Sequence, residues 1–229
     1  MLPVIWRVGY GETVDEPEPE RCCFDDWVDH WSDQATKKPT AAKVSASLLE
    51  AIEETGVADR TILDVGCGIG DLAIEVVARG AASGTGFDLS AKAIEEARKL
   101  AVARGVGDRM RFEVGDGAKL DLPAADIVVL NRVVCCYPDT ENLLVHTLGA
   151  AGSVFAMTAP VSGGVTGWFN RFWNKVLNVG YRLRPKKFAG FRTFIHDLDR
   201  IDERIRAAGF RRVKHEHRRV VWDLAVYAR

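Results

Sequence analysis

The sequence predicts a doubly wound α/β fold: a seven-stranded, mostly parallel sheet with an antiparallel last strand and helices on both faces. Five short apolar runs between residues 61 and 158 are typical of buried strands, and amphipathic stretches of helical period separate most of them. Repeated strand–helix–strand units form parallel sheets that are covered on both sides. Two further strand-like runs, 212–218 and 221–227, are so close together that they must pair antiparallel, because a parallel pair needs a long crossover.

The N-terminal part of the chain, residues 1–39, is predicted to form an arm and a lid helix. Residues 1–21 are rich in Pro, Glu and Gly, a composition typical of a loose arm. Within 24–36, aromatic and apolar side chains recur at helical spacing, which indicates a short amphipathic helix. A longer helix then opens the main domain, residues 40–229, and Gly56 ends that helix.

The main domain is predicted to alternate strands and helices in a regular order. The run Ile127-Val128-Val129-Leu130 is of the kind that a sheet buried on both faces requires. Ser90 is placed to cap a helix, while Gly80, Gly105 and Gly209 are placed to end helices. The predicted strands are 61–65, 85–87, 110–114, 126–130, 153–158, 212–218 and 221–227, and the predicted helices are 72–79, the stretch from Ser90 to before Gly105, 142–148 and 197–208.

Composition and charge limit the class of protein. The chain has 229 residues, 47% of them apolar and 28% charged, which suits one globular domain whose core needs no disulfide bonds. The net charge of −1 argues against a nucleic-acid partner. A basic excess from residue 165 onward favours either a solvated surface or an anionic partner. Because the sequence shows neither a signal peptide nor a run long enough to span a membrane, we expect a cytoplasmic protein.

The most informative motif is the loop Asp64-Val65-Gly66-Cys67-Gly68-Ile69-Gly70, where a predicted strand turns into a helix. Three glycines at alternate positions let the backbone turn tightly and bring bare main chain against a ligand. The helix N-terminus that follows presents unpaired N–H groups, which favour a carboxylate. The third glycine comes one residue earlier than in the G-x-G-x-x-G loop of dinucleotide enzymes. A dinucleotide site and a tight turn without a ligand are the alternatives.

This D-x-G-x-G-x-G pattern resembles the first motif of class I S-adenosylmethionine-dependent methyltransferases, and the resemblance covers about residues 40–160. It implies S-adenosylmethionine as the cofactor and a last strand that lies between the fifth and the sixth. Asp64 would hold the amino group of the methionine moiety. The loop residues Gly66, Cys67, Gly68 and Gly70 would contact the cofactor.

The remaining cofactor contacts that the resemblance implies follow the next strands. Asp88 would accept hydrogen bonds from both ribose hydroxyls, although a charge at the start of the next helix is an alternative. The sequence Gly115-Asp116-Gly117-Ala118 resembles the adenine site, with Asp116 accepting from the exocyclic amine; an ordinary turn is the alternative. Leu89 would pack near the adenosine, with core packing as the alternative. Asn131 and Arg132 are candidate contacts of cofactor or substrate, and a charge on a helix surface is the alternative for Arg132.

Few catalytic residues are expected, because methyl transfer from an activated sulfonium needs mainly alignment of the reactants and exclusion of water. A general base is needed only when the acceptor atom starts protonated. The candidate bases are His30 in the lid helix, Tyr137 and His196, each with a purely structural alternative. The segment after the fourth strand, 130–139, is not of the N-P-P-Y type that resembles enzymes acting on amino groups of nucleic acids.

Cysteines come as two adjacent pairs and a single residue in the glycine loop, Cys67. This pattern is neither a disulfide framework nor a zinc ligand spacing, so we predict no metal site. If the pairs meet in space, their thiols would suit a thiophilic species such as arsenite. The alternative is small buried side chains. The pairs are Cys22-Cys23 and Cys135-Cys136.

The insertion at about 160–192 combines an apolar stripe of helical period with basic and aromatic residues. It is predicted to be a lid over a greasy substrate pocket, an interfacial helix with weak membrane contact through 165–192, or packing across the sheet edge. Its layout is similar to Mg-protoporphyrin and quinone-type O-methyltransferases. We therefore expect methylation, at oxygen, of a small or medium, partly apolar metabolite; alternatives are methylation of sulfur or arsenic and a non-catalytic cofactor-binding module.

Overall fold

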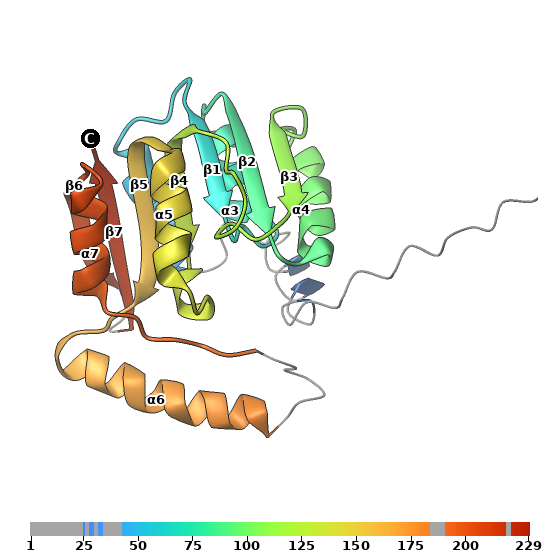
Figure 1. Cartoon of the computed structure of the whole chain (residues 1–229). Helices are drawn as coiled ribbons and strands as arrows, with labels where there is room; N and C mark the ends of the chain where they lie inside the picture. The colour runs from blue at the N-terminus through green and yellow to red at the C-terminus, as the bar shows by residue number, and fades with distance from the viewer. Residues whose placement is uncertain (1–24, 26–27, 30–31, 34–42, 184–190, 219–220) are drawn as a thin grey trace, which may run out of the picture.

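The computed structural model describes residues 25, 28–29, 32–33, 43–183, 191–218 and 221–229. One seven-stranded sheet forms its centre, with helices on both faces (Figure 1). The strand order is β3-β2-β1-β4-β5-β7-β6. This confirms the predicted fold class, including the position of the last strand between the fifth and the sixth. The strands are β1 (Thr61–Val65), β2 (Ser83–Asp88), β3 (Met110–Val114), β4 (Ala125–Asn131), β5 (Ala151–Pro160), β6 (Arg211–Arg218) and β7 (Trp222–Ala228).

The first five strands run parallel, and β7 pairs antiparallel with both β5 and β6. Because strand side chains alternate between faces, each buried strand feeds two separate cores. One core packs against α2, α3 and α4, and the other against α5 and α7. The helices are α2 (Lys43–Glu53), α3 (Asp71–Ala78), α4 (Ala91–Ala103), the short 3₁₀ helix η1 (Val134–Cys136), α5 (Thr140–Ala150), α6 (Gly164–Arg182) and α7 (Leu198–Ala207).

Helix ends follow the predicted signals. The Ser90 hydroxyl accepts a hydrogen bond from the backbone N–H of Ala93, as an N-cap should. Gly105 and Gly209 have positive φ angles just beyond α4 and α7. Of these caps, Ser90 fixes where α4 begins after β2, and so it helps to fix a loop at the carboxyl edge of the parallel strands.

The predicted lid helix over 24–36 lies mostly outside the described residues, as do the arm and the start of the predicted helix at residue 40. The described positions of this segment are helical. Val28 is buried against Ile69 of the glycine loop and Ala93 of α4, and Asp29 forms an ion pair of 2.8 Å with Lys92. Val28 therefore packs beside the glycine loop.

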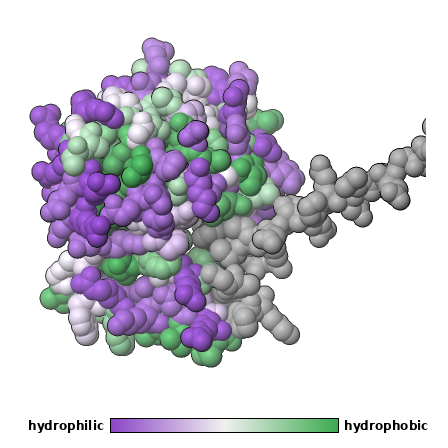
Figure 2. Space-filling view, viewed as in Figure 1, coloured by the Kyte–Doolittle hydropathy of each residue, from purple (hydrophilic) through white to green (hydrophobic). Residues whose placement is uncertain are grey.

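Helix α6 is attached to the rest of the fold through its asparagine side chains, which the sequence prediction did not foresee. Asn170 is buried and donates to the carbonyl of Val161 at 2.9 Å, while Asn174 and Asn178 bond to Thr193. The apolar stripe stays largely exposed, and Figure 2 shows hydrophobic side chains along the lower edge of the molecule, where α6 lies. None of the helices described is both long and apolar enough to cross a bilayer.

Candidate cofactor and acceptor sites

The glycine loop connects β1 to α3 through three left-handed backbone positions. Gly66, Gly68 and Gly70 have φ angles of 72°, 56° and 72°. Residues other than glycine adopt such positive φ angles only at a cost in free energy. A Cβ at Gly66 would also lie 2.5 Å from Val133 Cγ2. The backbone N–H groups of Gly66 and Cys67 both donate to the Phe87 carbonyl, at 2.7 and 2.9 Å. The loop is thus bound to the end of β2 and leads into the N-terminus of α3.

Three carboxyl groups gather around this loop. Burial, followed by the negative charges of Asp71 and Asp88, raises the pKa of Asp64 to about 8, against one backbone hydrogen bond from Ala73. Burial likewise raises the pKa of Asp71 and of Asp88. Among the described residues, Oδ1 of buried Asp64 has no hydrogen-bond partner. A buried, unpartnered carboxyl oxygen among like charges is a position that a cationic ligand group would stabilise.

Asp88 is oriented toward the loop by two backbone donors. Its Oδ2 accepts from the N–H of Gly68 at 2.8 Å, and its Oδ1 accepts from the N–H of Ser90 at 2.9 Å. Each oxygen keeps a second lone pair for a ligand hydroxyl. Leu89, beside it, is 45% exposed and offers an apolar contact at the surface. Cys67, in contrast, is buried, and burial raises the pKa of its thiol.

Asp116 and Tyr137 form a pair after β3. The Tyr137 hydroxyl donates to both carboxylate oxygens of Asp116, at 2.8 and 3.0 Å, while Ala118 N–H and Lys119 Nζ donate as well. Burial opposes ionisation of Asp116, but the bonds from Lys119, Tyr137 and Ala118 together lower its pKa. A Cβ at Gly117 would lie 2.2 Å from Val65 Cγ1, so this turn sits directly against the end of β1.

Asn131 links the sheet to α2. Its Nδ2 donates to Ser45 Oγ and its Oδ1 accepts from Thr158 Oγ1, both at 2.9 Å. These contacts hold the end of β4 in place. In this structure the Asn131 side chain therefore has a positioning role. Contact with a ligand remains a prediction.

The three candidate bases have different surroundings. His30 lies outside the described residues. Burial, and then the hydrogen bond to Asp116, raise the pKa of Tyr137 to about 12, so its hydroxyl stays protonated near neutral pH and is a poor candidate for the base. The Nε2 atom of His196 lies 3.0 Å from the Tyr137 carbonyl. Burial lowers the pKa of His196, so its imidazole is neutral at pH 7.

A cavity of about 450 Å³ lies between α6, the segment before α7 and the end of the sheet. Cys135 reaches it from η1, and Trp222 reaches it from β7. A cavity of this size with an apolar lining is typical of a small-molecule site. Its lining consists of Cys135, Pro160, Phe169, Asn170, Trp173, Asn174, Leu177, Thr193, Phe194, Ile195, Val221 and Trp222.

Sequence patterns do not indicate Asp71 as a site residue, and they give Arg132 only as a candidate contact. Asp71 at the start of α3 resembles an ordinary helix N-terminal charge, and only the structure shows it beside Asp64. Arg132 has a φ angle of 64°, an uncommon conformation for a residue with a side chain. Its guanidinium lies 5.5 Å from the centre of the Trp222 ring, and its charge lowers the pKa of Asp71. Arg132 therefore connects the carboxyl cluster with the wall of the cavity.

The cysteine pair at the cavity is close enough to interact. The Sγ atoms of Cys135 and Cys136 are 3.4 Å apart. A hydrogen bond from Cys136 lowers the pKa of Cys135, burial opposes this, and the charge of Arg132 adds to the lowering. The other pair, Cys22-Cys23, lies outside the described residues, so the meeting of the two pairs remains a prediction.

Strand order, the antiparallel β7 and the glycine loop together define the fold of class I S-adenosylmethionine-dependent methyltransferases, and the predicted resemblance is confirmed. Residues 62–148 match the family model described as a methyltransferase domain. Ribosomal protein L11 methyltransferase of Pasteurella multocida is 38% identical over 87 residues, which are 38% of this chain and 29% of the relative. The chain thus matches less than a third of that relative's length.

Solved structures extend the likeness over nearly the whole fold. Magnesium protoporphyrin IX methyltransferase from Synechocystis PCC 6803, solved with bound SAH, has a TM-score of 0.66 at 21% identity, over 88% of this chain and 93% of that one. An O-methyltransferase family 2 protein from Planctomyces limnophilus, solved with apigenin, has a TM-score of 0.64 at 16% identity, over 89% and 62%. At these identities the likeness establishes the fold.

Proposed function

We propose that this protein is an S-adenosylmethionine-dependent methyltransferase whose acceptor is a small or medium, partly apolar metabolite. The observation that carries the proposal is the unpartnered Oδ1 of buried Asp64, which lies beside two more carboxyl groups and a loop of bare backbone. The cofactor is a cation at both its amino group and its sulfonium, and its carboxylate suits the N-terminus of α3. A dinucleotide, whose pyrophosphate is anionic, would be repelled by the same cluster.

The residues fit the parts of the cofactor in chain order. Asp64 and the loop would hold the methionine moiety, Asp88 the ribose, and the turn at Asp116 the adenine. S-adenosylmethionine, when bound, supplies a methyl group that is already activated on a sulfonium. The protein's own contribution is to align the acceptor and to exclude water, and the arrangement of the carboxyl groups is fixed before binding, which reduces the cost of reorganisation.

The acceptor would occupy the cavity beneath α6. Its lining is mostly apolar and aromatic, and Cys135 brings it next to the segment that follows β4. Aromatic walls such as Phe169, Trp173 and Trp222 favour a flat or bulky acceptor. The names of two structural relatives, which mention protoporphyrin and apigenin, agree with an acceptor of this kind.

Oxygen is the acceptor atom that we favour, with His196 as the base. A hydroxyl must lose its proton as the new bond forms, and a neutral imidazole near the cavity can take it. Phe194, which lines the cavity, stacks on His196 at 5.7 Å between ring centres. The imidazole would then stand one ring away from the acceptor and would take the proton through a bridging water.

Methylation of a thiol or an arsenic species is the second candidate, and the lowered pKa of Cys135 at the cavity wall favours it. The two candidates respond differently to replacement of Cys135 and Cys136 by serine. A thiol-bound acceptor would lose all turnover in that variant, whereas a hydroxyl acceptor would keep most of it.

Methyl transfer can be tested directly with S-adenosylmethionine labelled in the methyl group and a panel of aromatic and isoprenoid acceptors. Trp173→Ala, in the cavity wall, should raise KM at least tenfold for the best acceptor. Val165→Ala, on the same helix but 86% exposed, is the matched control and should leave KM unchanged. If no acceptor is methylated while the cofactor still binds, the catalytic proposal fails and the cofactor-binding module remains.

Weak contact of α6 with an anionic membrane surface also remains a proposal. Val165, Trp168 and Val176 are all more than 40% exposed, and Arg171 and Lys175 lie on the same helix. An exposed apolar stripe with basic neighbours is the pattern of an interfacial helix. Sedimentation with vesicles of anionic phospholipid should remove the wild type from solution and leave a Trp168→Glu/Phe172→Glu variant behind, and equal sedimentation of both would exclude α6 as the contact.

A further inference from the structure

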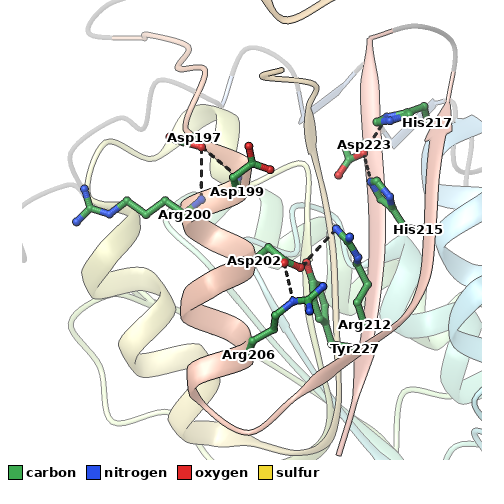
Figure 3. A network of polar contacts seen from close by, with 10 residues as sticks. All are labelled: Asp197, Asp199, Arg200, Asp202, Arg206, Arg212, His215, His217, Asp223 and Tyr227. Carbon is green, nitrogen blue, oxygen red and sulfur yellow. Dashed lines mark hydrogen bonds and ion pairs between the residues drawn. The ribbon is translucent and has the colours of Figure 1, made fainter. Parts of the chain in front are cut away.

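We propose that the β6–β7 hairpin carries a binding site for a divalent transition-metal ion, formed by His215, His217 and Asp223 (Figure 3). One candidate ligand atom of each residue lies within 4.8 Å of the other two. His215 Nε2 lies 2.7 Å and His217 Nδ1 lies 2.9 Å from the same oxygen, Oδ1 of Asp223. Three ligands therefore converge from two strands.

The distances are close to the spacing of ligands around a metal ion. Zinc binds imidazole nitrogen and carboxylate oxygen at about 2.0–2.2 Å. Two ligands at that radius lie about 3.0 Å apart at a right angle and about 3.4 Å apart at the tetrahedral angle. The two N···O contacts in the hairpin, at 2.7 and 2.9 Å, are slightly shorter, so the ligand atoms would move apart by less than about 1 Å to admit an ion. Two imidazoles and one carboxylate are also a donor set that suits Zn²⁺, Co²⁺ or Ni²⁺ better than Mg²⁺ or Ca²⁺.

Strand geometry explains why the three side chains meet. His215 and His217 are two residues apart on β6, so both point to the same face of the sheet. Asp223 lies directly opposite His217 in the antiparallel register, and Ala225 lies opposite His215. The small side chain of Ala225 leaves room for His215 to reach diagonally to Asp223. Both strands thus contribute to the site, and a bound ion would join them.

Charge and exposure are also suitable for a metal ion. The Asp223 side chain is 13% exposed, whereas those of His215 and His217 are 35% and 62% exposed. The ion would therefore have three protein ligands and at least one coordination position open to solvent. The nearby Asp202 differs, because Arg206, Arg212 and the Tyr227 hydroxyl already surround its carboxylate (Figure 3). In the hairpin site, the positive charge opposite the carboxylate would come from the ion.

Protonation fits this chemistry. In the free hairpin each imidazole donates a hydrogen bond to Asp223 through the nitrogen that faces it. When the ion binds, that nitrogen gives up its proton and the other ring nitrogen carries one, so the facing nitrogen becomes the ligand. Binding needs no oxidant and no covalent change. The site stands on the sheet edge and uses none of the residues that would hold the cofactor, so it is independent of the proposed methyl transfer.

The test is calorimetric titration of the full chain, treated with chelator, with Zn²⁺ alone. The wild type should bind one equivalent through these residues, and His217→Ala and Asp223→Asn should each weaken that binding at least tenfold. His146→Ala is the matched control, because His146 is partly exposed and its Nδ1 bonds to the Leu120 carbonyl, away from the hairpin, and this variant should bind as the wild type does. Circular dichroism checks that the variants fold, which the exposure of His217 favours.

Titration with Co²⁺ separates this site from the thiols. A site of two imidazoles and a carboxylate gives only weak visible absorption, whereas thiolate ligands add strong charge-transfer bands in the near ultraviolet. Because the ion joins two strands, Zn²⁺ should also raise the thermal midpoint of the wild type more than that of Asp223→Asn. Thiolate bands, or equal Zn²⁺ affinity in His217→Ala and the wild type, would overturn the proposal.

Discussion

At the scale of single residues, Asp64 is an ionisable side chain in a buried environment that disfavours its charged form. A carboxyl group is normally ionised at neutral pH, but this one is buried among other carboxyl groups and its pKa rises to about 8. Such a position costs stability in the free protein, and proteins keep costly buried polar groups mainly where a ligand uses them. The residue therefore provides both a stability test and a binding test.

Asp64→Asn should make the free protein less sensitive to pH. The native pKa lies above the unfolded value of 3.8, so the folded state binds more protons than the unfolded state between about pH 4 and 8, and wild-type stability falls as pH rises through that window. The difference amounts to roughly 1.4 kcal/mol for each pH unit in the window. Urea unfolding at pH 5 and pH 8 measures this. The free energy of unfolding of Asp64→Asn, relative to that of the wild type, should be higher at pH 8 than at pH 5. An equal loss in both proteins would mean that Asp64 is not the group responsible.

Tyr137→Phe should separate positioning from proton transfer. The variant removes the hydroxyl that donates to Asp116, a hydrogen bond worth about 1 kcal/mol. We expect cofactor affinity to fall about fivefold, by the same energy, with no change in the pH profile of kcat. A lost basic or acidic limb in that profile would instead identify Tyr137 as the base.

His196→Gln should lower kcat and remove the acidic limb of the pH profile if the acceptor is a hydroxyl. Because burial lowers the pKa of His196 below 6.5, that limb in the wild type should lie below the ordinary histidine value. The control is Tyr137→Phe, which should keep it. An unchanged kcat in His196→Gln would exclude this imidazole as the base.

At the scale of elements, helix α6 depends on one close approach. A Cβ at Gly167 would lie 1.9 Å from the backbone oxygen of Ser162, whereas a Cβ at Gly180, on the same helix, has open space. Gly167→Ala should therefore destabilise the docking of α6 by about 1–3 kcal/mol, while Gly180→Ala should be neutral or stabilise the helix by up to about 1 kcal/mol. Limited proteolysis within 164–182 measures both, and similar cleavage of the two variants would contradict the packing.

Sequence patterns predicted the elements better than their docking. The buried strands and the Ser90 cap follow from local rules, because apolar runs and capping hydroxyls act within a few residues. The docking of α6 does not follow from them. Its apolar stripe left a lid, an interfacial helix and packing across the sheet edge open. None of these three predictions includes the attachment that Asn170, Asn174 and Asn178 make through hydrogen bonds to distant backbone groups. A row of asparagines carries no periodic hydrophobic pattern from which this attachment could be predicted.

The candidate site shows the same limit. Asp64, Asp88 and Asp116 could be named because each belongs to a motif at the end of a strand. Asp71 comes close to these carboxyl groups only because the chain makes a left-handed turn at Gly70. The role of Arg132 depends on a backbone conformation that the neighbouring sequence does not predict. Contacts made by tertiary structure alone lie beyond what one sequence can predict.

At the scale of the whole molecule, cofactor binding should release a proton near neutral pH. Asp64 is largely protonated in the free protein because its pKa is about 8, and an amino group or sulfonium beside it favours the ionised form. Titrations with S-adenosylhomocysteine in buffers of different ionisation enthalpy should reveal this release at pH 7. Asp64→Asn should show none, and equal release in both proteins would assign the proton elsewhere.

The most direct test of the central claim is calorimetric titration of the wild type with S-adenosylmethionine, S-adenosylhomocysteine and NAD. If the carboxyl cluster and the glycine loop hold an amino-acid sulfonium, both adenosyl compounds bind at one site per chain, NAD does not, and Asp64→Ala weakens binding by at least tenfold. Binding of NAD alone, or full affinity in Asp64→Ala, would contradict the account.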